Sequence, residues 1–81
     1  MKIQVRFFAI ARELAKTSGL SVEIAAGATT LSALETVYGS YPALRSYHPH
    51  LRLAVNREYV GLTHILHEND ELALIPPVSG G

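Results

Sequence analysis

The stretch KIQVRFF at residues 2–8 alternates polar and apolar side chains before it ends in two aromatic residues. A period of two predicts a β-strand with one buried face, so Ile3, Val5 and Phe7 are expected in the core. By the same alternation, Phe8 is expected on the opposite face of the sheet. This strand is the first of five that the pattern predicts.

Outward from this strand, the pattern predicts two helices and four more strands. Helical spacing indicates a short helix over residues 9–16 and a longer one that begins between Thr29 and Ser32 and ends near Gly39. Alternation predicts strands near residues 20–24, 51–56, 59–60 and 71–75. Residues 43–50 are expected to be irregular, because Pro49 blocks a continued helix. The order β-α-β-α-β-β-β favours the α+β class, with a helix packed across one face of a single sheet.

Composition limits the class of protein. The 81 residues suit one domain, with residues 1–75 as its folded part and residues 76–81 as an extended tail. The formal net charge is zero, which argues against non-specific nucleic-acid binding, and the chain has no cysteine for a disulfide, a thiolate metal site or a nucleophile. No apolar run approaches the ~20 residues that a membrane span requires. With no signal-peptide pattern either, the expected location is the cytoplasm.

No motif of an ordinary active site is present. The sequence holds no P-loop, no dinucleotide-binding glycine pattern, no zinc-protease motif and no nucleophile elbow. His64 and His67 could share a metal if they were helical, but exposed loop histidines are the favoured interpretation, as for His48 and His50. The acidic turn at residues 68–71 is expected to be solvated. We therefore expect no metal site and no intrinsic cofactor.

The carboxyl-terminal stretch PPVSGG at residues 76–81 has an unusual shape. Two prolines favour an extended polyproline conformation, and six residues can span about 20 Å. Gly80 and Gly81 carry no side chain, so another protein can approach their backbone closely. Such a tail suits a narrow channel in a partner, to which it would present the α-carboxyl group of Gly81.

A possible docking surface lies near the root of this tail. If Leu72 and Leu74 point inward, Ile75 points outward like Phe8, and Tyr59 follows a turn close to the same strands. These three side chains could form an exposed apolar patch, which would mark a binding surface. The alternative is that the helix at residues 9–16 covers Phe8.

The ending NDELALIPPVSGG at residues 69–81 resembles the terminus of the small, sulfur-carrying subunit of molybdopterin synthase. FFA at residues 7–9 with REL at residues 12–14 resembles the first strand and helix of that family. AVN at residues 54–56, followed by Val60, resembles its central strand and turn. The resemblance spans essentially the whole chain and implies a ubiquitin-like β-grasp fold with a mixed sheet, in agreement with the element order.

The resemblance also implies a mechanism centred on Gly81. A ubiquitin-activating-like adenylyltransferase would use ATP to adenylate this glycine, and sulfur would then replace AMP to give a thiocarboxylate. The large subunit of molybdopterin synthase, in a heterotetramer, would accept the tail and transfer the sulfur to cyclic pyranopterin monophosphate. The chain would thus be a sulfur donor, not an enzyme by itself.

Further residue roles follow from the same resemblance. Gly80 would give clearance in the partner's tunnel, and the rest of the tail would lie in its active site. These tail residues are Pro76, Pro77, Val78 and Ser79. Phe8, Tyr59 and Ile75 would pack on the large subunit, although many relatives carry aromatic residues at the positions of Leu74 and Ile75.

Three alternatives stay open on sequence grounds. The chain could carry sulfur for another pathway, such as thiamine synthesis, tungsten-cofactor synthesis or tRNA thiolation. It could also be a ubiquitin-like modifier that is joined to lysines through Gly81. A simple interaction module with an inert tail is the third alternative.

Overall fold

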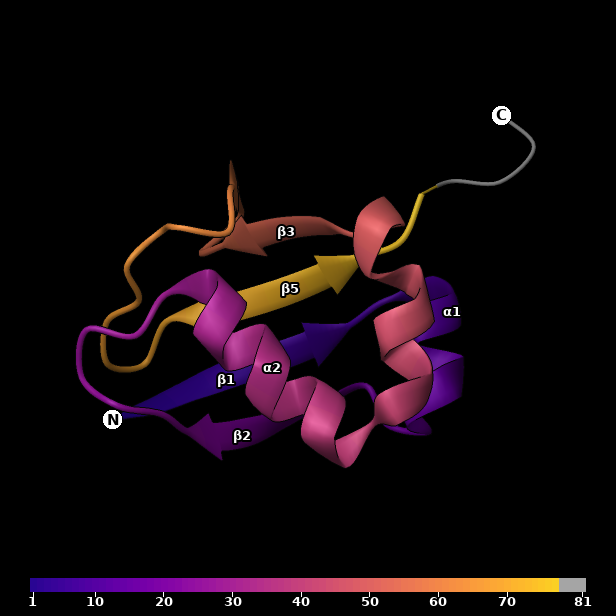
Figure 1. Ribbon diagram of the computed structural model, residues 1–81, viewed down its shortest axis with the longest axis horizontal. Coiled ribbons are helices and arrows are strands. Elements are labelled where there is room, and N and C mark those ends of the chain that lie inside the picture. Colours follow the sequence, from indigo (N-terminus) through magenta and orange to yellow (C-terminus); the bar gives the residue numbers. More distant parts are fainter. Residues whose placement is uncertain (78–81) are drawn as a thin grey trace.

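The computed structural model describes residues 1–77, which form one mixed sheet with two α-helices and a 3-10 helix, η1 (Figure 1). The elements are β1 Lys2–Phe7, α1 Ala9–Ala15, β2 Gly19–Glu23, α2 Thr30–Ser40, η1 Pro42–His50, β3 Arg52–Val55, β4 Glu58–Val60 and β5 Glu71–Ile75. The strand order is β2-β1-β5-β3-β4. β1 and β5 run parallel, and every other neighbouring pair is antiparallel. The predicted α+β class is confirmed.

The core lies between the sheet and α2, which crosses one face of the sheet (Figure 1). Ile3, Val5 and Phe7 are 0%, 1% and 2% exposed, as their alternation predicts. They meet buried residues of β5 and of α2, among them Leu34 and Leu72. Full burial of side chains of this size contributes about 1.5–3 kcal/mol each, so this layer is the main source of stability.

The ends of α2 lie close to the predicted positions. The Thr29 side chain accepts a hydrogen bond from the Ser32 amide at 3.3 Å, so Thr29 is the N-cap and the helix begins at Thr30. Gly39 lies inside the last turn, one residue before the helix ends at Ser40. Tyr41 ends the helix with a backbone hydrogen bond from its amide to the Val37 carbonyl.

The expectation of irregular structure at residues 43–50 is wrong. Pro42–His50 forms the 3-10 helix η1, which contains Pro49 and buries Leu44 completely. A 3-10 turn bonds residue i to i+3, and the fixed φ of proline is compatible with its backbone angles. Pro49 therefore prevents a continued α-helix but is compatible with this tighter helix.

Side chains join η1 to α2. The Tyr38 hydroxyl lies 2.7 Å from Nδ1 of His48, and Arg45 forms an ion pair with Glu35 at 3.0 Å. Burial raises the pKa of Tyr38; Arg45 opposes this rise and Glu35 adds to it. The hydroxyl of Tyr38 therefore stays protonated at neutral pH.

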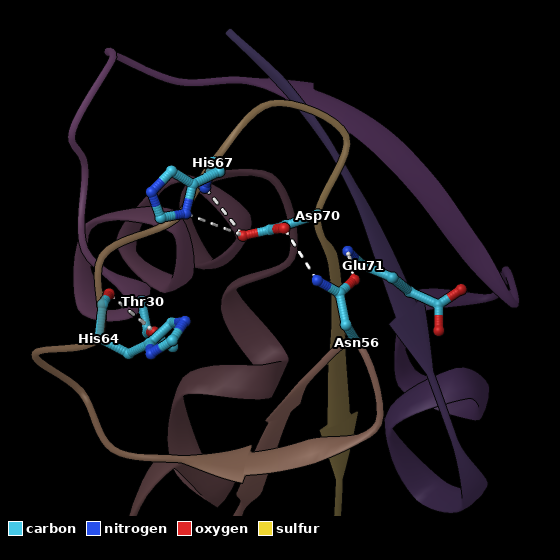
Figure 2. Close-up of polar contacts among 6 residues, drawn as sticks. All are labelled: Thr30, Asn56, His64, His67, Asp70 and Glu71. Atoms are coloured by element: carbon cyan, nitrogen blue, oxygen red, sulfur yellow. Dashed lines mark hydrogen bonds and ion pairs between the residues drawn. The ribbon is translucent and has the colours of Figure 1, made fainter.

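A polar network closes the end of the sheet where β5 begins (Figure 2). Asp70 accepts hydrogen bonds from the His67 amide at 2.8 Å and from the Asn56 side-chain amide at 2.9 Å. Asn56 in turn accepts from the Glu71 amide at 3.0 Å. The expectation of a solvated acidic turn is therefore wrong for Asp70, which is 9% exposed.

This network also sets the ionisation of Asp70. Burial alone would raise its pKa, but the hydrogen bonds from His67 and Asn56, with the rings of His67 and His64 nearby, hold the pKa below its ordinary value. The carboxylate thus stays charged and fastens the β3–β4 turn to the start of β5.

Candidate functional site

The sheet has a second face, opposite to α2, which we call the open face. Cross-strand register places Arg6, Ala73, Ala54 and Tyr59 in one row across it, from β1 through β5 and β3 to β4. The two alanines are small and buried, so they form a low floor between the larger residues at the ends of the row. The accessible surface of this row therefore comes from its ends, where Arg6 and Tyr59 are exposed.

Phe8 lies at the β1 end of the open face. Its amide donates to the Leu74 carbonyl at 3.3 Å, and its own carbonyl accepts from the Ala11 amide at 3.0 Å. The ring is 41% exposed, and the Arg6 guanidinium lies 5.8 Å from its centroid. α1 therefore leaves Phe8 accessible, which confirms the predicted direction of this side chain.

The turn after Phe8 carries an unusual backbone conformation. Ala9, the first residue of α1, has φ of 50°, in the left-handed region that side chains with a Cβ disfavour. This turn redirects the chain from β1 into α1 next to the end of β5. It thereby fixes Phe8 beside the point where the tail leaves the sheet.

A pocket of about 580 Å³ lies at this point, and we call it the tail-root pocket. Its lining is almost wholly apolar and comes from the residue after β1, from α1 and η1, and from the end of β5 with the two prolines that follow it. The lining residues are Phe8, Ala9, Ile10, Tyr47, Ile75, Pro76 and Pro77. The structure thus brings together Phe8, Ile75 and the first two residues of the predicted tail.

Tyr59 lies apart from the tail-root pocket, at the other end of the open face. It is 68% exposed on β4, and the Arg52 guanidinium lies 5.7 Å from its ring centroid. Arg52 is also the cross-strand partner of Ile75. Tyr59 and Ile75 are thus linked through Arg52 on one face, although they do not share a pocket.

Three residues of the tail-root pocket, Ala9, Ile10 and Tyr47, were missed by the sequence analysis. Ile10 comes from α1 and Tyr47 from η1, the element that sequence patterns did not predict. Only the packing of α1 against η1 places them together. The apolar character of Ile10 and Tyr47 indicates that each can contribute to an apolar surface, but no spacing rule in the sequence predicts that they lie together.

Part of the predicted site falls beyond the described residues. Pro76 is buried and Pro77 is exposed. The predicted roles of Val78, Ser79, Gly80 and Gly81 concern residues outside the described range 1–77.

The histidines do not assemble a metal site within residues 1–77, where no group of three or more potential ligands comes together. His50, His64 and His67 are exposed, as expected. His48 differs, because it is half-buried and bonded to Tyr38. Within the same range, no helix has the length and hydropathy to cross a membrane.

Comparisons with known proteins bear on the family and the fold of the chain. Residues 5–81 match the ThiS family. A molybdopterin synthase sulfur carrier subunit from Arabidopsis thaliana is 38% identical over 81 residues, which cover 100% of this chain and 84% of that protein. The crystal structure of SAMP1 from Haloferax volcanii, at 32% identity, superposes with a TM-score of 0.93 over 100% of both chains.

A further solved structure shows a relative together with another protein. It is the complex of subunits 1 and 2 of the molybdopterin-converting factor from Helicobacter pylori 26695. One chain of that complex is 26% identical, with a TM-score of 0.71 and coverage of 100% of both chains. These likenesses confirm the ubiquitin-like β-grasp fold.

Proposed function

The chain belongs to the ThiS family, and on this premise we propose that it is the sulfur carrier subunit of a molybdopterin synthase. The observation that carries the proposal is the match to a molybdopterin synthase sulfur carrier subunit over the whole of this chain, through Gly81. The apolar tail-root pocket and the open face support it, because they surround the base of the segment that must enter a partner.

The proposed chemistry takes place at the carboxyl group of Gly81. A carboxylate oxygen attacks the α-phosphate of ATP in a separate adenylyltransferase, and pyrophosphate leaves. Hydrosulfide from a sulfur source then attacks the acyl carbon, AMP leaves and the sulfur loses its proton, which yields a thiocarboxylate. Adenylation is needed because a free carboxylate is a poor electrophile, whereas the mixed anhydride has a good leaving group.

The second half of the proposed reaction occurs in the large subunit. The thiocarboxylate sulfur is a strong nucleophile that attacks a carbon of cyclic pyranopterin monophosphate, and water then hydrolyses the bond between this sulfur and the Gly81 acyl carbon. The sulfur stays on the pterin and Gly81 returns to a carboxylate. Acid–base and phosphate-binding groups belong to the partners, so the carrier contributes position rather than catalysis. Phe8, Ile75 and Tyr59 contribute by docking the body of the chain so that the tail enters the partner's active site.

A reconstitution tests this proposal directly. The chain, its adenylyltransferase, ATP and a sulfur source are incubated, and the large subunit and cyclic pyranopterin monophosphate are then added. We expect molybdopterin with the full chain and none after deletion of Gly81, while the circular dichroism spectrum and thermal midpoint stay the same. Molybdopterin formation by the truncated chain would contradict the proposal.

A second candidate function is a protein modifier. The observation in its favour is the likeness to SAMP1, and a small archaeal modifier protein 1 from Haloferax volcanii is 34% identical over 84 residues. In this case Gly81 would be joined to lysine side chains of other proteins. Isopeptide-linked conjugates in extracts of the native cell, lost after deletion of Gly81, would support the modifier, whereas thiocarboxylate without conjugates would support the carrier.

A further inference from the structure

Within residues 1–77, the outer edge of β4 has backbone groups without partners. The two-residue turn Asn56-Arg57, with φ of 52° and 72°, makes Val55 and Glu58 the pair that closes the hairpin. Hydrogen-bonded and non-bonded pairs alternate along an antiparallel ladder. The next pair, Ala54 and Tyr59, is therefore non-bonded, so the amide and carbonyl of Tyr59 point away from β3.

The adjoining β3–β5 ladder supports this assignment. The Asn56 amide donates to the Glu71 carbonyl at 2.9 Å, so the backbone groups of Asn56, and two residues earlier those of Ala54, face β5. Ala54 therefore makes no backbone hydrogen bond to β4, and the backbone groups of its cross-strand neighbour Tyr59 face outward. Gly61 follows directly after the end of β4, and within residues 1–77 neither Tyr59 nor Gly61 makes a backbone hydrogen bond outside the sheet.

An apolar groove of about 460 Å³ runs beside this edge. It lies between β4, the end of η1 and α2. The residues that line it are Leu34, His48, Pro49, Leu51, Arg52, Leu53, Tyr59, Val60, Gly61 and Leu62. An exposed sheet edge next to apolar side chains is the geometry that accepts an added strand, in which the backbone pairs and alternate side chains fill the groove.

Charge indicates which kind of segment fits. Arg52 lines the groove and, within the described residues, forms no ion pair, while none of the described residues in the lining is acidic. Arg52 and Tyr59 also belong to the open face, so the groove is continuous with the proposed docking surface. The same partner can therefore cover both.

We propose that the protein that accepts the tail adds an extended segment to the β4 edge, with apolar side chains in the groove and a carboxylate beside Arg52. This inference rests on the proposed function, because it assigns a second contact to the partner named there. The segment would form a sixth strand, bonded to Tyr59 and Gly61.

The first test is amide hydrogen exchange, followed by NMR in the free chain and in the complex with its large subunit. We expect exchange of the Tyr59 and Gly61 amides to slow at least tenfold in the complex. A complex in which both amides exchange as in the free chain would overturn the inference and leave the proposed function standing. If the intact chain fails to bind the large subunit at all, the proposed function fails and this inference falls with it.

A pair of substitutions at Gly61 distinguishes a hydrogen bond from the Gly61 amide to the partner from simple shielding of this amide by the partner. A Cβ at this position meets no atom within 4 Å, so Gly61→Ala keeps the amide donor without a clash, whereas Gly61→Pro removes the donor. We expect Gly61→Ala to bind within about twofold of the unsubstituted chain and Gly61→Pro about tenfold more weakly. Equal affinities of two folded variants would contradict the added strand.

A second pair tests the groove. Leu62 lines it and is 38% exposed, whereas Leu31 lies outside it and is 39% exposed. Leu62→Glu should weaken the complex at least tenfold and Leu31→Glu should not; equal effects would argue against the groove. The other possible occupant of this edge is a second copy of the chain, which sedimentation of the free chain tests. A dimer that protects the Tyr59 and Gly61 amides would overturn the proposal.

Discussion

Truncation of Phe8 to alanine separates docking from folding. The ring is 41% exposed, and an aromatic side chain buries about 150–250 Å² in total, so about 80 Å² remains for a partner to cover. At about 25 cal/mol per Å², that area contributes about 2 kcal/mol to binding, which corresponds to about a 30-fold change in Kd. Phe8→Ala should therefore weaken the complex with the large subunit by about that factor.

The same substitution should leave the chain folded. The part of the ring that already packs against the protein is about 120 Å², so its loss should lower the free energy of unfolding by about 3 kcal/mol, less than the usual total for a domain. Isothermal titration with the large subunit measures the Kd, and urea unfolding measures the stability. Leu31→Ala is the matched control, because Leu31 is 39% exposed but belongs to α2, away from the open face.

Two results would refute this reasoning. A folded Phe8→Ala variant that binds as tightly as the unsubstituted chain would show that the ring is not at the interface. A variant that fails to fold would show that Phe8 acts as a core residue despite its exposure. An equal loss of affinity in Leu31→Ala would show that the effect is not specific to the open face.

Three further predictions concern stability. Because the pKa of Asp70 is lower in the folded than in the unfolded chain, its contribution is complete above the unfolded pKa and is lost as pH falls through the folded pKa. Asp70→Asn should therefore flatten the acid side of the plot of thermal midpoint against pH, and an unchanged slope would contradict the account. Ala9→Gly should change the free energy of unfolding by less than about 0.5 kcal/mol, since glycine relieves the positive φ, whereas Ala15→Gly should cost about 1 kcal/mol or more. Equal losses in the two variants, measured by urea unfolding, would argue against strain at Ala9. Tyr38→Phe should cost about 1 kcal/mol through the lost bond to His48, and a urea midpoint that does not move would show that the bond contributes little.

Local patterns predicted the parts of the fold that depend on neighbours in sequence. The alternation of Ile3, Val5 and Phe7 gave the buried face of β1, and Thr29 gave the start of α2. The same alternation placed Phe8 on the open face. These predictions succeed because burial on one face of a strand or helix imposes a fixed period on the sequence.

Patterns failed where contacts join distant residues. The 3-10 helix η1 has a single buried residue, Leu44, so it carries little apolar periodicity. Asp70 is buried because Asn56, 14 residues earlier, reaches it across the sheet. The tail-root pocket likewise exists only because the topology brings Ile10 and Tyr47 to the end of β5. Residue type alone does not predict such contacts between residues that are distant in the sequence.

The most direct test of the central claim is the intact mass of the chain after incubation with ATP, a sulfur source and its own adenylyltransferase. We predict that the mass rises by the difference between sulfur and oxygen, with the change localised to Gly81 by fragmentation. An unchanged mass under conditions in which the adenylyltransferase consumes ATP, or a change located on another residue, would contradict the assignment of this chain as a sulfur carrier.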